Sequence, residues 1–172
     1  MAGKSVMFLF VCALTLITEG QAASRQKRSL PQFALMMTCA TGTNPLEYNG
    51  YGCYCGSGGG GTPVDATDRC CYAHDQCYSR LKSDGHCVKE TGDVYTMLYR
   101  SKQKNCGQSN VQITCKRARQ YNWLESLAVF WKTNCAAGAC ECDRQAALCF
   151  KRNRGTFSRS YVNYHKYTRC RY

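Results

Sequence analysis

Histidine is scarce in this sequence, which has only three histidines against 15 cysteines. Zinc sites commonly combine cysteine with histidine, so this ratio fits a disulfide framework better than a set of zinc sites. The glycine-rich segment 49–61 lacks the Lys-Ser/Thr ending of a P-loop, which argues against that class of nucleotide site. The sequence also has no internal repeat, in keeping with a single domain.

Acidic residues are also few, since 11 Asp and Glu stand against 23 Lys and Arg, a formal net charge of +12. Residues 151–172 contain seven basic residues and no acid. This balance favours anionic partners such as phospholipid surfaces or polyanionic glycans, although charge can also serve only to keep a small protein soluble. We expect no nucleic-acid partner, because the sequence has no recognised nucleic-acid-binding motif.

The apolar run near the N-terminus, residues 6–17, is shorter than the about 20 residues that a membrane span needs. Lys4 precedes it and small residues follow it, which is typical of a secretory signal peptide. We predict a signal peptide at 1–22, a propeptide at 23–28 that ends in a basic cleavage site, and one domain at 29–172. The protein is therefore expected to be secreted and extracellular, with a net charge of +9 after processing.

Processing makes the cysteine count even, because Cys12 lies in the predicted signal peptide and 14 of the 15 cysteines remain. Export places the chain in an oxidising compartment, where paired cysteines persist as disulfides. We therefore predict up to seven disulfides.

Local patterns predict helices at 30–37, 66–80 and 141–152, and a hairpin within 91–114. Asp65 is suited to cap the second helix, in which His74 and Asp75 project about 100° apart. Different neighbours are therefore expected for the two side chains, which suits a base that faces substrate and a carboxylate that faces a cation. The glycines of 49–61 allow a loop to turn its carbonyls toward such a cation.

Two pairs of cysteines have the same spacing of seven residues, close to two helical turns. If the two helices are antiparallel, Cys70 pairs with Cys149 and Cys77 with Cys142. That arrangement brings Asp143 close to His74, where a carboxylate can fix the tautomer of a histidine base. Parallel helices would pair the cysteines the other way and move Asp143 away, and the spacing alone leaves both arrangements open.

Three motifs resemble those of the secreted phospholipase A2 family, and the resemblance covers nearly all of 29–172. Residues 51–59, YGCYCGSGG, resemble the calcium loop of the family. Residues 70–78, CCYAHDQCY, and 140–149, CECDRQAALC, resemble its two catalytic helices. Cysteines at positions 39 and 170 resemble the pancreatic and elapid-venom branch.

The resemblance implies a mainly α, disulfide-rich fold with two long antiparallel helices joined by disulfides, an N-terminal helix, a calcium loop and a small β-wing hairpin. It selects the antiparallel pairing above and adds five further disulfides. These are Cys39–Cys106, Cys53–Cys170, Cys55–Cys71, Cys87–Cys135 and Cys115–Cys140.

The resemblance also implies calcium-dependent hydrolysis of the sn-2 ester of glycerophospholipids, giving a fatty acid and a lysophospholipid. His74 would be the general base, Asp143 would orient it, and Tyr78 and Tyr99 would support the network. The implied Ca²⁺ ligands are the carbonyls of Tyr54, Gly56 and Gly58 and the carboxylate of Asp75, and the Gly56 N–H would help to stabilise the oxyanion.

Other features leave alternatives open. The main rival function is a non-enzymatic binder on the same scaffold, such as a toxin or receptor ligand. The expected partner is a phospholipid membrane or micelle surface, and a receptor or an anionic glycan is a further candidate. His86 and His165 match no catalytic position and are interpreted as surface residues. Pro31 stands where many pancreatic-type members carry tryptophan.

The segment between Cys115 and Cys135 has 19 residues, where the family usually has only a few. The insertion, at about 117–131, contains both tryptophans of the chain and has apolar residues at helical spacing. It is interpreted as an interfacial lipid-binding segment, a structural elaboration packed on the β-wing, or the product of a mis-joined exon.

Overall fold

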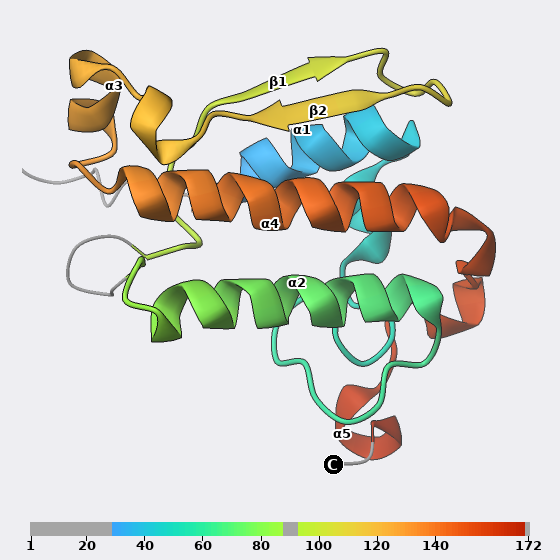
Figure 1. The fold of residues 1–172 in the computed structure, drawn as a ribbon. Helices are drawn as coiled ribbons and strands as arrows, with labels where there is room; N and C mark the ends of the chain where they lie inside the picture. Colours follow the sequence, from blue (N-terminus) through green and yellow to red (C-terminus); the bar gives the residue numbers. More distant parts are fainter. Residues whose placement is uncertain (1–28, 88–92, 171–172) are drawn as a thin grey trace, which may run out of the picture.

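The computed structural model describes residues 29–87 and 93–170. The predicted signal peptide and propeptide lie outside the described residues. The first described helix, α1 (Ser29–Thr41), packs along α4 (Thr133–Arg152). On the other side of α4 lies α2 (Ala66–Ser83), so the two long helices form the centre of the molecule (Figure 1). No described helix is both long and apolar enough to span a bilayer.

The hairpin consists of β1 (Ser101–Lys104) and β2 (Gln112–Cys115), which pair antiparallel with Ser101 opposite Cys115. Ile113 is buried, and its neighbours along β2 are not, as expected for a strand with one face on a core. The hairpin lies over α1 and the middle of α4 (Figure 1). The predicted hairpin is therefore confirmed, with shorter strands than the segment 91–114 allowed.

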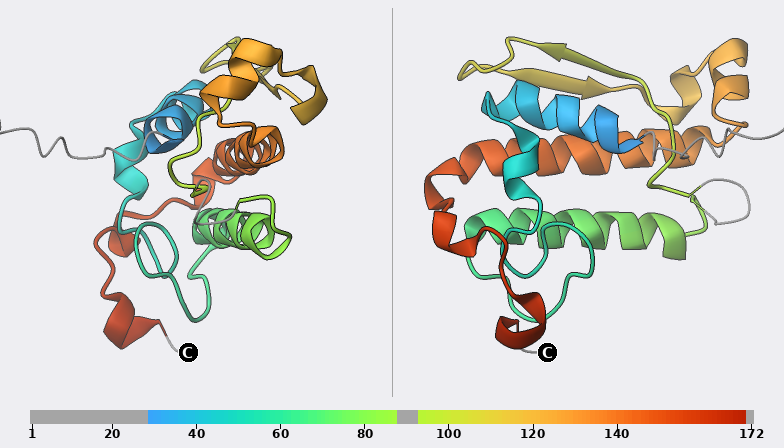
Figure 2. Two further views of the ribbon diagram at one scale, coloured as in Figure 1. Left: turned by 90° about the vertical axis from the view of Figure 1, so that its left-hand side faces the viewer. Right: turned by 180° about the vertical axis from the view of Figure 1, so that it is seen from behind.

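The remaining elements are short and connect or terminate the long helices. They are η1 (Pro45–Tyr48), η2 (Ala118–Gln120), α3 (Trp123–Ala128), η3 (Arg154–Thr156), η4 (Arg159–Tyr161) and α5 (Lys166–Arg169). Figure 2 shows α3 and α5 at opposite corners of the molecule.

All seven predicted disulfides are formed. Disulfides Cys70–Cys149 and Cys77–Cys142 join α2 to α4. This pairing requires antiparallel helices and decides between the two arrangements that the spacing left open. The other five bridges are Cys39–Cys106, Cys53–Cys170, Cys55–Cys71, Cys87–Cys135 and Cys115–Cys140.

Small residues of α4 allow its neighbours to pack closely on it. Ala136, Ala139, Ala146 and Ala147 are buried along the helix. Gly138 lies against Leu81 of α2, and a Cβ built on Gly138 would lie only 2.5 Å from Leu81 Cδ2. The long helices can therefore approach each other closely at this point.

Two predicted helix bounds were wrong by more than one turn, and α2 ends at Ser83, three residues beyond its predicted end. α4 begins at Thr133 rather than Glu141, because Cys135, Ala136 and Ala139 continue its buried face by a further two turns. α1 continues to Thr41, beyond the predicted end at Met37. The small and sulfur-containing residues of these turns give a weak hydrophobic pattern, and they become helical because disulfides and neighbouring helices cover them.

The insertion also departs from its prediction. Helical spacing was expected to continue to Trp131, but α3 ends at Ala128 and the chain then turns sharply. Phe130 and Trp131 both have positive φ, at 51° and 59°. The apolar side chains of the segment are nevertheless exposed, as described below.

Candidate active site

The start of α2 fixes the direction of the helix that carries His74 and Asp75. Asp65 caps the helix, since its side chain accepts a hydrogen bond from the backbone N–H of Asp68 at 2.8 Å. Tyr51 in turn donates its hydroxyl proton to Asp65. The cap and the glycine loop are therefore joined at one end of α2.

Asp143 is the centre of a buried hydrogen-bond network. Its side chain is fully buried, and its Oδ1 lies 2.7 Å from His74 Nε2. Tyr78 donates to Oδ1 and Tyr99 donates to Oδ2, each at 2.6 Å. The four predicted catalytic residues thus meet in one network, although they come from α2, α4 and the segment before β1.

Both tyrosines of this network remain proton donors over the whole physiological range. Burial is the largest cause that raises the pKa of Tyr78, and the charge of Asp143 and its hydrogen bond raise it further. The same causes raise the pKa of Tyr99 in the same order. A carboxylate that accepts these bonds and the His74 bond is well satisfied in the interior.

Asp143 engages one ring nitrogen of His74 and leaves the other for a further partner. The engaged nitrogen is Nε2, so Nδ1 is the nitrogen that can take a proton from water. The ring stacks on Phe33 of α1, with centroids 4.6 Å apart, and its side chain is 13% exposed. Phe33 was read from the sequence only as part of an apolar helix, and the structure shows that it packs directly on the candidate base.

A groove of about 400 Å³ runs between α2 and α4 and includes His74 in its lining. Arg144 and Arg152 also line it, but Asp75, Phe33 and the glycine loop do not. The groove therefore reaches His74 from a side other than that of the loop. It lies next to the predicted catalytic site and does not contain it.

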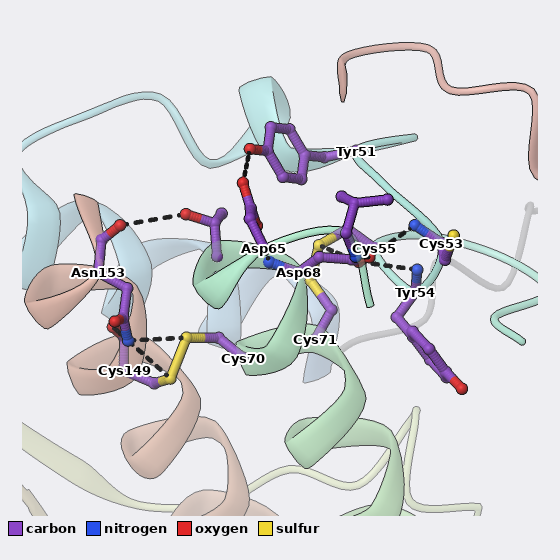
Figure 3. The surroundings of a disulfide bond; sticks show 12 residues. Tyr51, Cys53, Tyr54, Cys55, Asp65, Asp68, Cys70, Cys71, Cys149 and Asn153 are labelled. Atoms are coloured by element: carbon purple, nitrogen blue, oxygen red, sulfur yellow. Dashed lines mark hydrogen bonds between the residues drawn. A yellow bond between two sulfur atoms is a disulfide. The ribbon is translucent and has the colours of Figure 1, made fainter. Parts of the chain in front are cut away.

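Asp68 anchors the glycine loop and was missed by the sequence reasoning. It is fully buried and accepts hydrogen bonds from the backbone N–H groups of Cys53, Tyr54 and Val64 at 2.7, 2.8 and 3.0 Å (Figure 3). Gly52 has φ +56°, and a Cβ there would lie 2.4 Å from Asp68 Cγ. The one sequence feature that could have drawn attention to Asp68 is its position three residues after the helix cap Asp65.

Asp75 faces the same loop. A Cβ built on Gly59 would lie 3.2 Å from Asp75 Oδ2, so the loop backbone passes directly beside this carboxylate. Burial raises the pKa of Asp75, and the neighbouring charges of His74 and Lys166 partly oppose that effect. His74 and Asp75 therefore have different neighbours, as their positions on the helix predicted.

Lys166 of α5 also contacts the loop. Its ammonium donates to the carbonyls of Cys55 and Ser57 at 3.0 and 3.2 Å. These carbonyls alternate in sequence with the predicted cation ligands, the carbonyls of residues 54, 56 and 58. Within the described ranges no three His, Cys, Asp or Glu side chains cluster for a metal, so a cation beside Asp75 would need backbone carbonyls as its other protein ligands.

The other two histidines described lie apart from this network. His86 is exposed beyond the end of α2, and His165 precedes α5. Their placement agrees with the interpretation as surface residues.

The fold and the site define a class: a small helical protein cross-linked by disulfides, in which a carboxylate-bound histidine is followed by an aspartate that faces a glycine loop. Such a site is suited to general-base hydrolysis. The phospholipase A2 family model matches residues 30–162. The chain therefore belongs to the phospholipase A2 family.

Relatives in several animals support this assignment. Phospholipase A2 AP-PLA2-II of Acanthaster planci is 40% identical over 94% of this chain and 98% of its own length. Group IIE secretory phospholipase A2 of Homo sapiens is 37% identical over 92% of this chain and 88% of its own. Basic phospholipase A2 Tpu-G6D49 of Craspedocephalus puniceus is 43% identical over 83% of each chain. The narrower assignment to the pancreatic and elapid-venom branch stays a prediction.

Proposed function

We propose that the protein is a secreted, calcium-dependent phospholipase A2 that hydrolyses the sn-2 ester of glycerophospholipids to a fatty acid and a lysophospholipid. The observation that carries this proposal is the buried Asp143 network, which holds His74 with Nδ1 free.

The network assigns each side chain a role in moving one proton. His74 Nδ1 takes a proton from the attacking water, and the ring becomes an imidazolium. Asp143 stabilises this cation through Nε2, while Tyr78 and Tyr99 keep its carboxylate fixed. His74 then returns the proton to the leaving alkoxide of the lysophospholipid.

The residues beside His74 fit a bound calcium ion. Asp75 is a half-buried carboxylate beside a loop with positive φ at Gly56 and Gly58, which only glycine adopts readily. Asp75 and the carbonyls of Tyr54, Gly56 and Gly58 would hold the ion. When bound, Ca²⁺ polarises the ester carbonyl and stabilises the oxyanion. The Gly56 N–H would donate to the same oxygen.

The proposed substrate site lies between His74 and the glycine loop, because these groups must reach the same ester. Phe33 would border the acyl chain there, since it covers one face of the base. Export from the cell, with membrane or micelle surfaces as the working partner, follows from the disulfide content and the secretory relatives. A receptor or an anionic glycan stays a predicted additional partner.

A calcium titration of phospholipid hydrolysis tests this function. We expect His74→Gln to lose at least about 100-fold in kcat at saturating calcium, because general-base catalysis contributes about 10²–10⁴. Asp75→Asn should instead shift the calcium dependence to higher concentration. The matched control is His86→Gln at the exposed position beyond the end of α2, which should retain full activity.

Chain-specific product analysis completes the test. Phosphatidylcholine with different acyl chains at sn-1 and sn-2 should release only the sn-2 chain. Release of the sn-1 chain, or equal activity of the His74→Gln variant and the wild type, would overturn the assignment.

A further inference from the structure

The insertion presents several exposed apolar side chains on one short segment. Five large apolar side chains within nine residues are between 49% and 77% exposed. They are Trp123, Leu124, Leu127, Phe130 and Trp131. We call these five residues the α3 patch. Five exposed large apolar side chains on nine residues of chain indicate an interaction site, whereas single exposed apolar residues scattered over a surface are common and need no explanation.

The end of α3 is built to display two of these side chains. The N–H of Trp131 bonds to the carbonyl of Ser126 at 2.7 Å, and that of Phe130 bonds to Leu127 at 3.0 Å. This is the Schellman pattern of helix ends, in which the left-handed position usually holds glycine. Here that position holds Phe130, with φ 51° and 77% exposure. Folding alone would favour glycine, so the aromatic side chain points to a role outside the fold.

The patch stands on a rigid base. Asn122 and Glu125 form a reciprocal capping box at the start of α3, and Lys116 donates to Glu125. Val129 is buried beneath the helix end. The disulfide Cys115–Cys140 ties the start of the segment to α4. At its other end the chain continues directly into α4, where Cys135 is bonded to Cys87. The apolar side chains are therefore held outward rather than left on a free loop.

Positive charge surrounds the patch. Between residues 114 and 134 the chain has four basic residues and one acid, and that acid, Glu125, is bonded to Lys116. Arg117 and Arg119 are exposed, and Lys132 directly follows Trp131. A second copy of the chain would bring two such positive margins together, which charge repulsion opposes. An anionic phospholipid surface instead offers negative head groups above an apolar interior, with an interface that favours tryptophan.

We propose that residues 117–132 form a membrane anchor that inserts the α3 patch into anionic phospholipid surfaces while its basic residues contact the head groups. The anchor lies at the end of the molecule where α1 and α4 begin (Figures 1 and 2). It deepens the proposed function by supplying a second contact with lipid, and the binding itself requires neither calcium nor His74.

Tryptophan fluorescence tests this anchor directly, because both tryptophans of the chain lie in the patch. The processed protein is titrated with phosphatidylcholine vesicles, with and without 30% phosphatidylserine, in EDTA so that hydrolysis plays no part. We expect a blue shift with the anionic vesicles, quenching by brominated lipid, and weaker binding in high salt.

Phe130→Gly separates membrane binding from folding. We expect about tenfold weaker partition onto anionic vesicles, but unchanged or higher thermal stability, because glycine relieves the left-handed strain. The control is Tyr167→Ser in α5, at the opposite corner of the molecule, which removes a 96% exposed aromatic side chain and should leave partition unchanged. Leu124→Ser with Leu127→Ser provides a second variant, also with weaker binding expected.

Three results would overturn the anchor. The first is that Phe130→Gly and the double leucine variant bind vesicles as strongly as wild type. The second is that anionic vesicles cause no blue shift. The third is a concentration-dependent dimer that these substitutions abolish without affecting vesicle binding, which would assign the patch to a second copy. Loss of hydrolysis in an enzyme that still binds vesicles would contradict only the proposed function.

Discussion

Replacing Tyr99 by phenylalanine tests the Asp143 network through its effect on stability at neutral and alkaline pH. The substitution keeps the ring and removes one hydroxyl, whose bond to Asp143 Oδ2 is 2.6 Å and buried. A hydrogen bond to a charged group contributes about 1.5–3 kcal/mol. We therefore expect Tyr99→Phe to lower the free energy of unfolding by about that amount at pH 7, measured by guanidinium denaturation with the disulfides intact.

The destabilising effect of Tyr99→Phe becomes smaller at alkaline pH. The pKa of Tyr99 is raised in the folded protein, from an ordinary value of 10.0, by burial and then by Asp143. Its contribution to stability is complete below pH 10 and is lost as pH rises, because only the unfolded chain then releases the proton. Well above pH 10 the loss approaches about 1.4 kcal/mol per pH unit for one group. Between pH 10 and 11 the difference in free energy of unfolding between Tyr99→Phe and wild type should narrow by about 1 kcal/mol, because the tyrosine of the unfolded chain is already half ionised at pH 10.

Tyr167→Phe is the matched control, since Tyr167 is almost fully exposed and should change neither the stability at pH 7 nor the slope above pH 10. Parallel pH profiles for Tyr99→Phe and wild type would refute the reasoning. So would an unchanged free energy of unfolding at pH 7, because the hydroxyl would then make no net contribution.

Two further substitutions test how the loop and the helix pair are held. Asp68→Ala leaves three backbone N–H groups without their acceptor, so we expect about 3–5 kcal/mol lower stability, measured by denaturation. Calcium binding should also weaken, measured by calorimetric titration, and unchanged calcium affinity would show that the loop needs no such anchor. Gly138→Ala should lower the free energy of unfolding by about 1–3 kcal/mol, because the added methyl group would clash with Leu81. Adding Leu81→Ala should remove that clash, so strictly additive losses in the double variant would contradict this contact.

Much of the candidate site could be predicted from local patterns. Asp65 as a helix cap, the rotation between His74 and Asp75, and the glycine loop all follow from residue type and spacing. The spacing of cysteines offered two helix directions, and the family resemblance selected the one that the structure shows. Asp68 and Phe33 could not be found in this way, because an acid in a first helical turn and a phenylalanine in an apolar helix have common explanations that need no site.

The insertion shows a second limit of sequence patterns. Apolar residues at helical spacing predicted one helix to Trp131, whereas α3 ends at Ala128. Phe130 occupies a left-handed position that propensity assigns to glycine. A helix end of this kind depends on which carbonyls the following N–H groups reach, and the buried Val129 and flanking disulfides help to fix that choice.

The sequence by itself determined the residue types of the chemistry, the number of disulfides and the capped helix that carries His74 and Asp75, because these depend on side-chain chemistry and local spacing. Only the tertiary structure decided that Asp143 and the two tyrosines converge on His74 from separate segments. It also decided that Asp68 ties down the loop and that the α3 patch stays outside the core. These outcomes depend on burial and on contacts between distant segments, which no local pattern contains.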